Sequence, residues 1–405
     1  MASVTSSGSD QANKTAFAII VAVSFCHLLN DIMQSLLTAI YPVIKDNYQL
    51  DYTQIGILTF TFQVTASLLQ PLIGIITDRW PMPYSLPVGM LSTCTGLITL
   101  AFAHDFSMLL IGASLIGLGS AIFHPESSRV ARLASGGRHG LAQSLFQVGG
   151  NAGSAMGPLL AAFIVLPYGQ GSVAWFSLAA LIGFFVLIRV GKWYSESYRS
   201  AMHRTAPSRA LPLPRRQVIW ALLVLVLLTT TKNVYMASFS SYFTFYTIER
   251  FGVSVQNSQL LLFLFLGASA AGVFLGGPIG DRFGTRFVIW FSILGVIPFA
   301  LLLPYASLFW TAVLTVIIGL IFSSAFSNIV VFAQELVPGR VGMIAGVFFG
   351  FAFGAGGVGA ALLGGYVDLY GIEFVYKLCS YFPLLGVLTI FLPRLSESRG
   401  AKKAA

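Results

Sequence analysis

A stripe of polar side chains interrupts the first long apolar run of the sequence. His27, Asn30, Asp31 and Gln34 are spaced i, i+3, i+4 and i+7, so on an α-helix their side chains share one face. A carboxylate inside an apolar helix is costly unless it is paired or protonated, and ionisable residues in such positions usually serve a function. The stripe therefore predicts a proton-coupling role for Asp31 and a substrate-binding role for His27, Asn30 and Gln34. A structural hydrogen bond between helices is the alternative.

A second group of ionisable side chains lies in a later apolar run, around Pro125. Glu126 and Arg129 can form an ion pair on one helix face, whereas His124 and Glu126 would point in nearly opposite directions. A carboxylate that exchanges an arginine partner for a proton links protonation to conformation. We therefore expect Glu126 and His124 to take part in proton coupling and Arg129 to bind substrate. An ion pair that only holds helix ends together is the alternative.

Lys232 lies deep within another apolar run. A lysine there can bind an anionic group of a substrate, or it can pair with Asp31 across the molecule. Amide side chains mark further runs, and the sequence predicts that Gln147, Asn151 and Asn328 bind substrate as well. Such amides can also join helices without touching any ligand.

The composition of the chain predicts that these residues lie in a membrane-spanning scaffold. The chain has 405 residues, of which 56% are hydrophobic and 9% are charged, whereas about 25% of the residues in a soluble domain are charged. The sequence therefore predicts an all-α integral membrane protein. The polar segment before the first span lacks the layout of a cleavable signal peptide, so we expect it to be retained. The predicted spans are twelve helices at residues 17–45, 52–78, 84–103, 107–134, 140–166, 170–191, 216–246, 256–280, 285–305, 307–335, 340–366 and 372–392.

The basic residues are distributed unevenly among the loops. The net charge is +9, and most of the 23 Lys and Arg residues fall on the side that also holds both termini and the central loop. By the positive-inside rule that side is the cytoplasm. The expected partners are therefore the lipid bilayer and a small-molecule substrate, not nucleic acid, and the expected location is the bacterial inner membrane. The cysteines lack the spacing of metal ligands, so no metal site is expected.

The sequence repeats itself at about half its length. The segments Gly74 to Arg79 and Gly277 to Arg286 each close an apolar run with the pattern Gly-x-x-x-Asp-Arg, and Gly140 matches Gly342 at nearly the same offset. Six predicted spans lie in each half, so the halves are parallel repeats related by an axis along the membrane normal. The predicted domains are a cytoplasmic N-terminal tail at 1–16, a six-helix bundle at 17–192, a cytoplasmic linker at 193–215, a second six-helix bundle at 216–393 and a cytoplasmic C-terminal tail at 394–405.

This arrangement resembles the major facilitator superfamily over essentially the whole chain. The Asp-Arg motif between the second and third helices is that family's most recognisable motif. The second copy fits it well, and the first departs after Arg79, where Trp80-Pro81-Met82-Pro83 replaces the usual Gly and basic residues. The resemblance implies two pseudo-symmetric six-helix bundles and a motif that locks the cytoplasmic gate. We expect Asp281 to pair with a nearby arginine or with the N-terminus of a neighbouring helix. The expected gate residues are Gly74, Asp78, Arg79, Gly277, Asp281, Arg282, Gly284 and Arg286.

Three further segments, His27 to Asp31, Gln70 to Gly74 and Phe123 to Glu126, resemble one group of bacterial drug exporters in that superfamily. The resemblance implies export of a small phosphonate drug in exchange for protons, by a monomer without a cofactor. The residues alone leave the direction open, because the same carboxylate could serve proton-coupled uptake of an organic anion or a sugar.

Other sources of energy and other activities find less support in the sequence. No Gly-x-x-x-x-Gly-Lys-Ser/Thr loop occurs, so an ion gradient is the expected energy source. No His-Glu-x-x-His or Gly-x-Ser-x-Gly motif occurs either, so an enzyme is not expected. A channel would not need duplicated halves with paired gate motifs.

Overall fold

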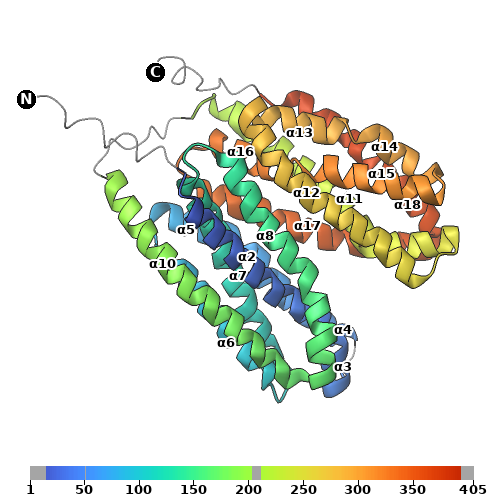
Figure 1. Cartoon of the computed structure of the whole chain (residues 1–405), viewed down its shortest axis with the longest axis horizontal. Helices are drawn as coiled ribbons and strands as arrows, with labels where there is room; N and C mark the ends of the chain where they lie inside the picture. The colour runs from blue at the N-terminus through green and yellow to red at the C-terminus, as the bar shows by residue number, and fades with distance from the viewer. Residues whose placement is uncertain (1–14, 51, 203–210, 394–405) are drawn as a thin grey trace, which may run out of the picture.

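A computed structural model describes residues 15–50, 52–202 and 211–393 of the chain. The predicted C-terminal tail, most of the N-terminal tail and part of the predicted linker lie outside the described residues. The described part consists of helices in two bundles that lie against each other (Figure 1). Each predicted span corresponds to one helix or to consecutive helices. Nine helices in the described part are long and apolar enough to cross a membrane.

The first bundle contains the first six predicted spans. Two of these spans are interrupted by short irregular helical segments, and Pro125 lies inside a third. The elements are α2 (Phe17–Ala39), α3 (Tyr41–Tyr48), α4 (Tyr52–Gln63), η1 (Val64–Leu68), α5 (Leu69–Arg79), α6 (Ser85–Ala101), α7 (Phe106–Ala134), α8 (His139–Leu160), η2 (Ala161–Val165), α9 (Leu166–Tyr168), η3 (Gln170–Trp175) and α10 (Phe176–Met202).

The second bundle contains the other six predicted spans. Its first helix begins directly after Pro214, whose fixed φ suits the start of a helix. The elements are α11 (Arg215–Phe251), α12 (Val255–Phe283), α13 (Thr285–Leu294), α14 (Ile297–Leu302), η4 (Leu303–Tyr305), α15 (Leu308–Ser323), α16 (Phe326–Leu336), α17 (Val341–Tyr370), α18 (Ile372–Ser380) and η5 (Phe382–Phe391).

Apolar side chains fill the centre of each bundle. The core of the first bundle joins α2, α6, α7 and α10, and it extends to Ala345 and Phe349 of α17 in the second bundle. Large apolar side chains such as Phe60, Leu166 and Phe309 remain exposed. Exposed apolar surface of this kind suits a protein that is surrounded by lipid.

The helix before the predicted linker is longer than the sequence suggested. We expected the linker to begin at residue 193, but α10 continues to Met202. Tyr194 is buried with 2% of its surface exposed, and Trp193 packs against the core of the first bundle. Tertiary contacts of these two aromatic residues therefore extend the helix into a segment whose composition is polar.

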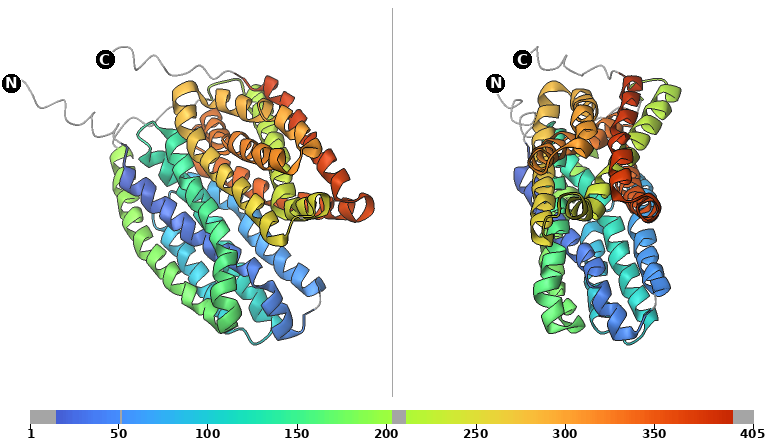
Figure 2. Two further views of the ribbon diagram at one scale, coloured as in Figure 1. Left: turned by 45° about the vertical axis from the view of Figure 1, so that its right-hand side comes forward. Right: turned by 90° about the vertical axis from the view of Figure 1, so that its right-hand side faces the viewer.

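The two bundles touch at the end that carries both Asp-Arg motifs, which we call the gate end. There α5 packs against α17 and α8 packs against α12. The opposite ends of the bundles diverge, as Figures 1 and 2 show. Glycine permits the close approach, because a Cβ atom added to Gly140 would lie 2.5 Å from the carbonyl oxygen of Gly277. A Cβ atom at Gly74 would overlap the backbone of Gly342 in the same way.

Candidate functional site

Three ionisable side chains meet inside the first bundle. His27 and Asp31 come from α2, and His124 comes from α7. The Nε2 atom of His27 lies 3.3 Å from Nε2 of His124 and 3.4 Å from Oδ2 of Asp31. The Nε2 atom of His124 lies 3.6 Å from Oδ1 of Asp31. All three residues are buried: the exposed fraction of the surface is 0% for His27, 7% for Asp31 and 2% for His124.

The hydrogen bonds of the two imidazoles fix their tautomers. The Nδ1 atom of His27 lies 2.7 Å from the carbonyl oxygen of Phe146, and Nδ1 of His124 lies 3.0 Å from the carbonyl oxygen of Ser120. A carbonyl oxygen only accepts, so each Nδ1 atom donates. In the neutral rings both Nε2 atoms therefore carry lone pairs, and these lone pairs face the carboxylate of Asp31. The cluster is an acceptor-rich place for a cation.

Neighbouring amides hold the carboxylate of Asp31 in place. Asn30 and Gln34 each donate from their side-chain amide to Oδ1 over 3.1 Å. Ser154 of α8 donates to Oδ2 over 3.4 Å, and Ser120 donates to Oε1 of Gln34 over 2.8 Å. The polar stripe predicted on α2 thus forms one connected network. His124, which the sequence could not connect with α2, belongs to the same network.

Lys232 lies in the second bundle. It is buried, with 6% of its surface exposed. Its ammonium group donates to the carbonyl oxygen of Phe322 and lies 3.8 Å from the centre of the Phe322 ring. Among the described residues, the ionisable side chains that lie within 4 Å of the carboxylate of Asp31 are His27 and His124. The predicted alternative of a pair between Lys232 and Asp31 is therefore not present in this conformation.

The amides predicted to bind substrate are in different surroundings. Gln147 is buried and Asn151 is partly buried, both on α8. Asn328 is fully buried and donates to the carbonyl oxygen of Gly276 over 2.8 Å. In this conformation Asn328 therefore joins α16 to α12, which is the helix-joining alternative that the sequence left open.

The predicted pair between Glu126 and Arg129 is confirmed, and it belongs to the gate end. Arg129 Nη1 lies 2.9 Å from Oε1 of Glu126, and Nη2 lies 2.5 Å from Oδ1 of Asp78. Arg129 also donates to the carbonyl oxygen of Thr77 over 2.6 Å, and Ser85 donates to Oε2 of Glu126 over 3.3 Å. His124 and Glu126 have different partners, as their expected opposite directions on the helix predicted. Two carboxylates hold the guanidinium of Arg129, although the sequence predicted a substrate-binding role for it.

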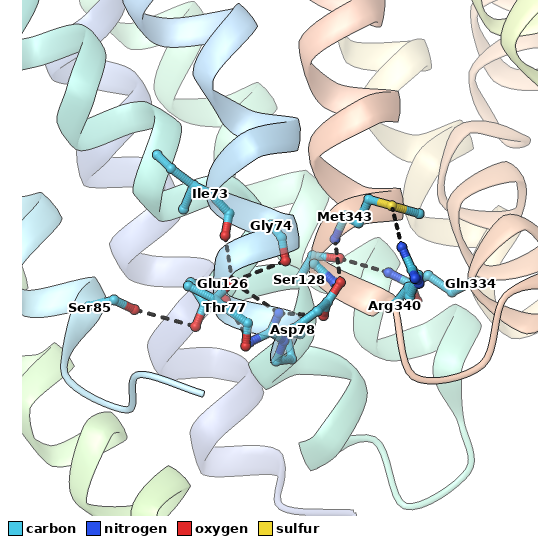
Figure 3. A network of polar contacts seen from close by, with 12 residues as sticks. Ile73, Gly74, Thr77, Asp78, Ser85, Glu126, Ser128, Gln334, Arg340 and Met343 are labelled. Carbon is cyan, nitrogen blue, oxygen red and sulfur yellow. Dashed lines mark hydrogen bonds and ion pairs between the residues drawn. The ribbon is translucent and has the colours of Figure 1, made fainter. Parts of the chain in front are cut away.

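Asp78 connects this ion-pair group to the second bundle. Its Oδ1 accepts from the backbone N–H of Gly342 over 3.0 Å, and its Oδ2 accepts from that of Met343 over 2.8 Å. These two amides belong to the first turn of α17, where unpaired N–H groups and the helix dipole favour a negative charge. Figure 3 shows Asp78 between the end of α5 and Met343.

Asp281 makes the same contact in the opposite sense. Its Oδ1 accepts from the N–H of Gly140 and its Oδ2 from that of Leu141, each over 2.8 Å, at the start of α8. The expected pairing of Asp281 with a neighbouring helix N-terminus is therefore confirmed. The arginines that follow the two aspartates lie over aromatic rings, with Arg79 4.6 Å from the ring centre of Trp80 and Arg282 5.3 Å from that of Phe283.

A third connection at the gate end was not predicted. Arg132 of α7 donates to Oε1 of Gln334 on α16 over 3.1 Å, and the amide of Gln334 donates to Ser128 over 3.2 Å. Ser128 in turn donates to Oε1 of Gln143 on α8 over 3.0 Å. Arg132 and Gln334 stand at equivalent positions of the two repeats, since the offset between them is that of Gly140 and Gly342. This repeat offset is the feature of the sequence that could have pointed to the contact.

Comparisons with known proteins agree with this architecture. The family model described as the Major Facilitator Superfamily matches residues 23–361 and 234–405. The chain is 59% identical over 382 residues to the fosmidomycin resistance protein of Escherichia coli K12, covering 94% of both chains. It is 41% identical over 385 residues to the uncharacterized MFS-type transporter YfnC of Bacillus subtilis 168, covering 94% of this chain and 93% of that one.

Solved structures agree on the fold. The MFS transporter FucP in the outward conformation superposes with a TM-score of 0.71 at 15% identity, covering 94% of this chain and all 100% of that chain. The proton:xylose symporter XylE gives a TM-score of 0.70 at 13% identity, covering 94% of this chain and 96% of the other. The chain is therefore a multi-pass membrane transporter that belongs to the Major Facilitator Superfamily.

Proposed function

We propose that this chain exports a small phosphonate drug such as fosmidomycin across the bacterial inner membrane, in exchange for protons. The observation that carries this proposal is the 59% identity with the fosmidomycin resistance protein over 94% of both chains. At that identity over nearly the full length, the substrate class is expected to be shared. The transporter would act as a monomer. Both termini would lie in the cytoplasm, as the distribution of basic residues favours.

The contacts at the gate end support alternating access. Asp78 and Asp281 each bind the first turn of a helix in the other bundle. Both sets of hydrogen bonds must break before the substrate can enter from the gate end. The bundles diverge at the opposite end (Figure 2). With the gate end in the cytoplasm, this conformation faces outward. Rocking of one bundle against the other would give the inward-facing conformation.

The cluster of His27, Asp31 and His124 supports exchange of the drug for a cation. Four acceptor atoms, two imidazole nitrogens and both carboxylate oxygens, converge there, each within 3.6 Å of a neighbour, in a buried part of the first bundle. A proton is the cation we propose, because a proton gradient is available across the inner membrane. Lys232 is the candidate for the anionic group of the drug, provided that its ammonium leaves the carbonyl of Phe322 when the substrate binds.

Accumulation of labelled fosmidomycin in cells tests the function. A fosmidomycin-sensitive bacterium without its own exporter should accumulate less drug when it expresses this chain, and a protonophore should restore accumulation. Asp31→Asn should behave like an empty vector, whereas Asp105→Asn, which alters an exposed helix cap, should behave like the parent. Equal accumulation with and without the parent chain would contradict the proposal.

A further inference from the structure

We propose that His27, Asp31 and His124 form a binding site for a first-row divalent transition-metal cation, with Zn²⁺ as the ion that the geometry fits best. These residues bring two imidazole nitrogens and a carboxylate together, and their ligand atoms all lie within 4.8 Å of one another. The inference concerns the same cluster as the proposed function. It does not depend on the identity of the transported drug.

The spacing of the two imidazole nitrogens and the two carboxylate oxygens is close to that of ligands in a tetrahedral metal site. Zinc binds imidazole nitrogen and carboxylate oxygen at about 2.0–2.2 Å, and two ligands at the tetrahedral angle are then separated by roughly 3.3–3.5 Å. The separations are 3.3 Å between the two Nε2 atoms, 3.4 Å from His27 Nε2 to Oδ2 of Asp31 and 3.6 Å from His124 Nε2 to Oδ1 of Asp31. With one oxygen of Asp31 counted as the ligand, all ligand atoms lie within 4.8 Å of one another. Small rotations of the three side chains would therefore bring all of them into bonding distance of one ion.

The surroundings orient the ligands as in known metal sites. A metal-binding histidine usually donates its other ring N–H to a carbonyl or carboxylate, which fixes the tautomer and makes the ligand nitrogen more basic. Both histidines do this here, to the carbonyl oxygens of Phe146 and Ser120. Asn30 and Gln34 hold the carboxylate of Asp31 from the outside through their amides. Each proposed ligand is thus held by at least one hydrogen bond to a residue outside the cluster.

The ligand types select the class of ion. Two imidazoles suit Zn²⁺, Co²⁺ and Ni²⁺, whereas Mg²⁺ and Ca²⁺ prefer shells of oxygen atoms. Gly150 of α8 leaves room beside the cluster, because a Cβ atom there would overlap the ring of His27 and lie 2.9 Å from Oδ2 of Asp31. With three protein ligands, the fourth tetrahedral position is available to water.

The test uses the full-length chain without a polyhistidine tag, purified in detergent and stripped with a chelator. Titration with Co²⁺ should produce the visible absorption bands of a tetrahedral site and saturate at one ion per chain, and Zn²⁺ should displace the Co²⁺. His27→Ala and His124→Ala should each weaken Co²⁺ affinity by about 100-fold or more, since loss of a ligand exceeds the 10–100-fold cost of losing an outer-shell partner. His104→Ala, an exposed histidine outside the cluster, is the matched control and should leave affinity unchanged.

Asp31→Asn keeps the shape of the side chain, so it tests the site even if the alanine variants misfold. It should lose the tetrahedral bands while its size-exclusion profile matches that of the parent. Gly150→Ala should also weaken binding, because its methyl group would fill the space beside the cluster. Failure of the parent to bind Co²⁺, or binding that survives both histidine substitutions, would overturn the inference.

The binding measurement is independent of transport. Co²⁺ binding without any effect of the chain on fosmidomycin accumulation would contradict the proposed function and support the metal site. Export of the drug by a chain that binds no Co²⁺ would support the proposed function and contradict the metal site.

Discussion

The contact between α5 and α17 and the contact between α8 and α12 follow the same plan in opposite halves of the molecule. In each, an aspartate at the end of one helix accepts two backbone N–H groups from the first turn of a helix in the other bundle. The surroundings of the two aspartates differ. Asp78 is bound by Arg129, which is held in turn by Glu126, and the equivalent positions in the second repeat are Val331 and Asn328.

The repeated motif therefore supplies the contact between the bundles, while the helix beside it determines which side chains hold the aspartate. Around Asp78 that support is ionic and buried, so loss of one carboxylate removes a charge-assisted hydrogen bond from the buried guanidinium of Arg129. At the position equivalent to Glu126, Asn328 donates to a backbone carbonyl within its own bundle. We therefore expect the α5–α17 contact to control the conformation more strongly than the α8–α12 contact.

Asp78→Asn should have the largest effect. It removes the charge that faces both Arg129 and the first turn of α17, and breaking a buried ion pair from one side costs about 3–5 kcal/mol. We expect the gate end to open in most molecules and transport to be nearly abolished. Pulsed EPR distances between spin labels at Trp80 and Arg340, both exposed, measure the opening. A distance distribution like that of the parent would contradict this expectation.

Glu126→Gln should have an intermediate effect. Arg129 would lose one of its two carboxylates but keep Asp78, and a hydrogen bond to a charged group contributes about 1.5–3 kcal/mol. The same spin-label pair should then report a mixture of closed and open molecules. Glu373→Gln is the matched control, because it alters a half-exposed ion pair with Arg250 at 3.8 Å. If both variants behave alike, the ion pair of Glu126 contributes nothing to the gate.

Asp281→Asn should have a smaller effect than Asp78→Asn. It weakens the cap on α8, and loss of a capping side chain costs about 0.5–2 kcal/mol. Spin labels at the exposed residues Arg138 and Phe283 should show a minor open population. Opening as complete as in the Asp78 variant would mean that the two contacts are equivalent, contrary to the comparison.

The contact between Arg132 and Gln334 offers the smallest expected effect. Arg132→Gln should cost about 1.5 kcal/mol, the lower value for a hydrogen bond to a charged group, because Arg132 is only partly buried. Because the two positions are equivalent in the repeats, the exchange variant Arg132→Gln with Gln334→Arg should recover most of the loss in thermal stability. A double variant that is less stable than either single variant would show that the position of the charge matters beyond this contact.

Much of the fold could be predicted from the sequence, because hydropathy and charge act over short distances along the chain. The spans, the repeat and the Asp-Arg motifs all follow from such local patterns. The pairing of Glu126 with Arg129 could also be predicted, since both residues lie on one helix face. The end of α10 could not, because burial of Tyr194 depends on contacts with the rest of the bundle.

The candidate site could be predicted only in part. The stripe around Asp31 was visible in the spacing of α2, but the approach of His124 to His27 depends on how α7 packs against α2. The orientation of Lys232 toward Phe322 depends likewise on the packing of α11 against α15. A single sequence contains the residue types at such a site, whereas their distances arise from tertiary packing.

The most direct test of drug export in exchange for protons is the sign of the pH gradient that drives uphill transport. Proteoliposomes with the purified chain should accumulate labelled fosmidomycin when the interior is more acidic than the medium, because protons leaving the vesicle would drive the drug inward. The opposite gradient should give no accumulation, and Asp31→Asn should give none under either gradient. Accumulation only when the medium is the more acidic side would identify a symporter and contradict the account.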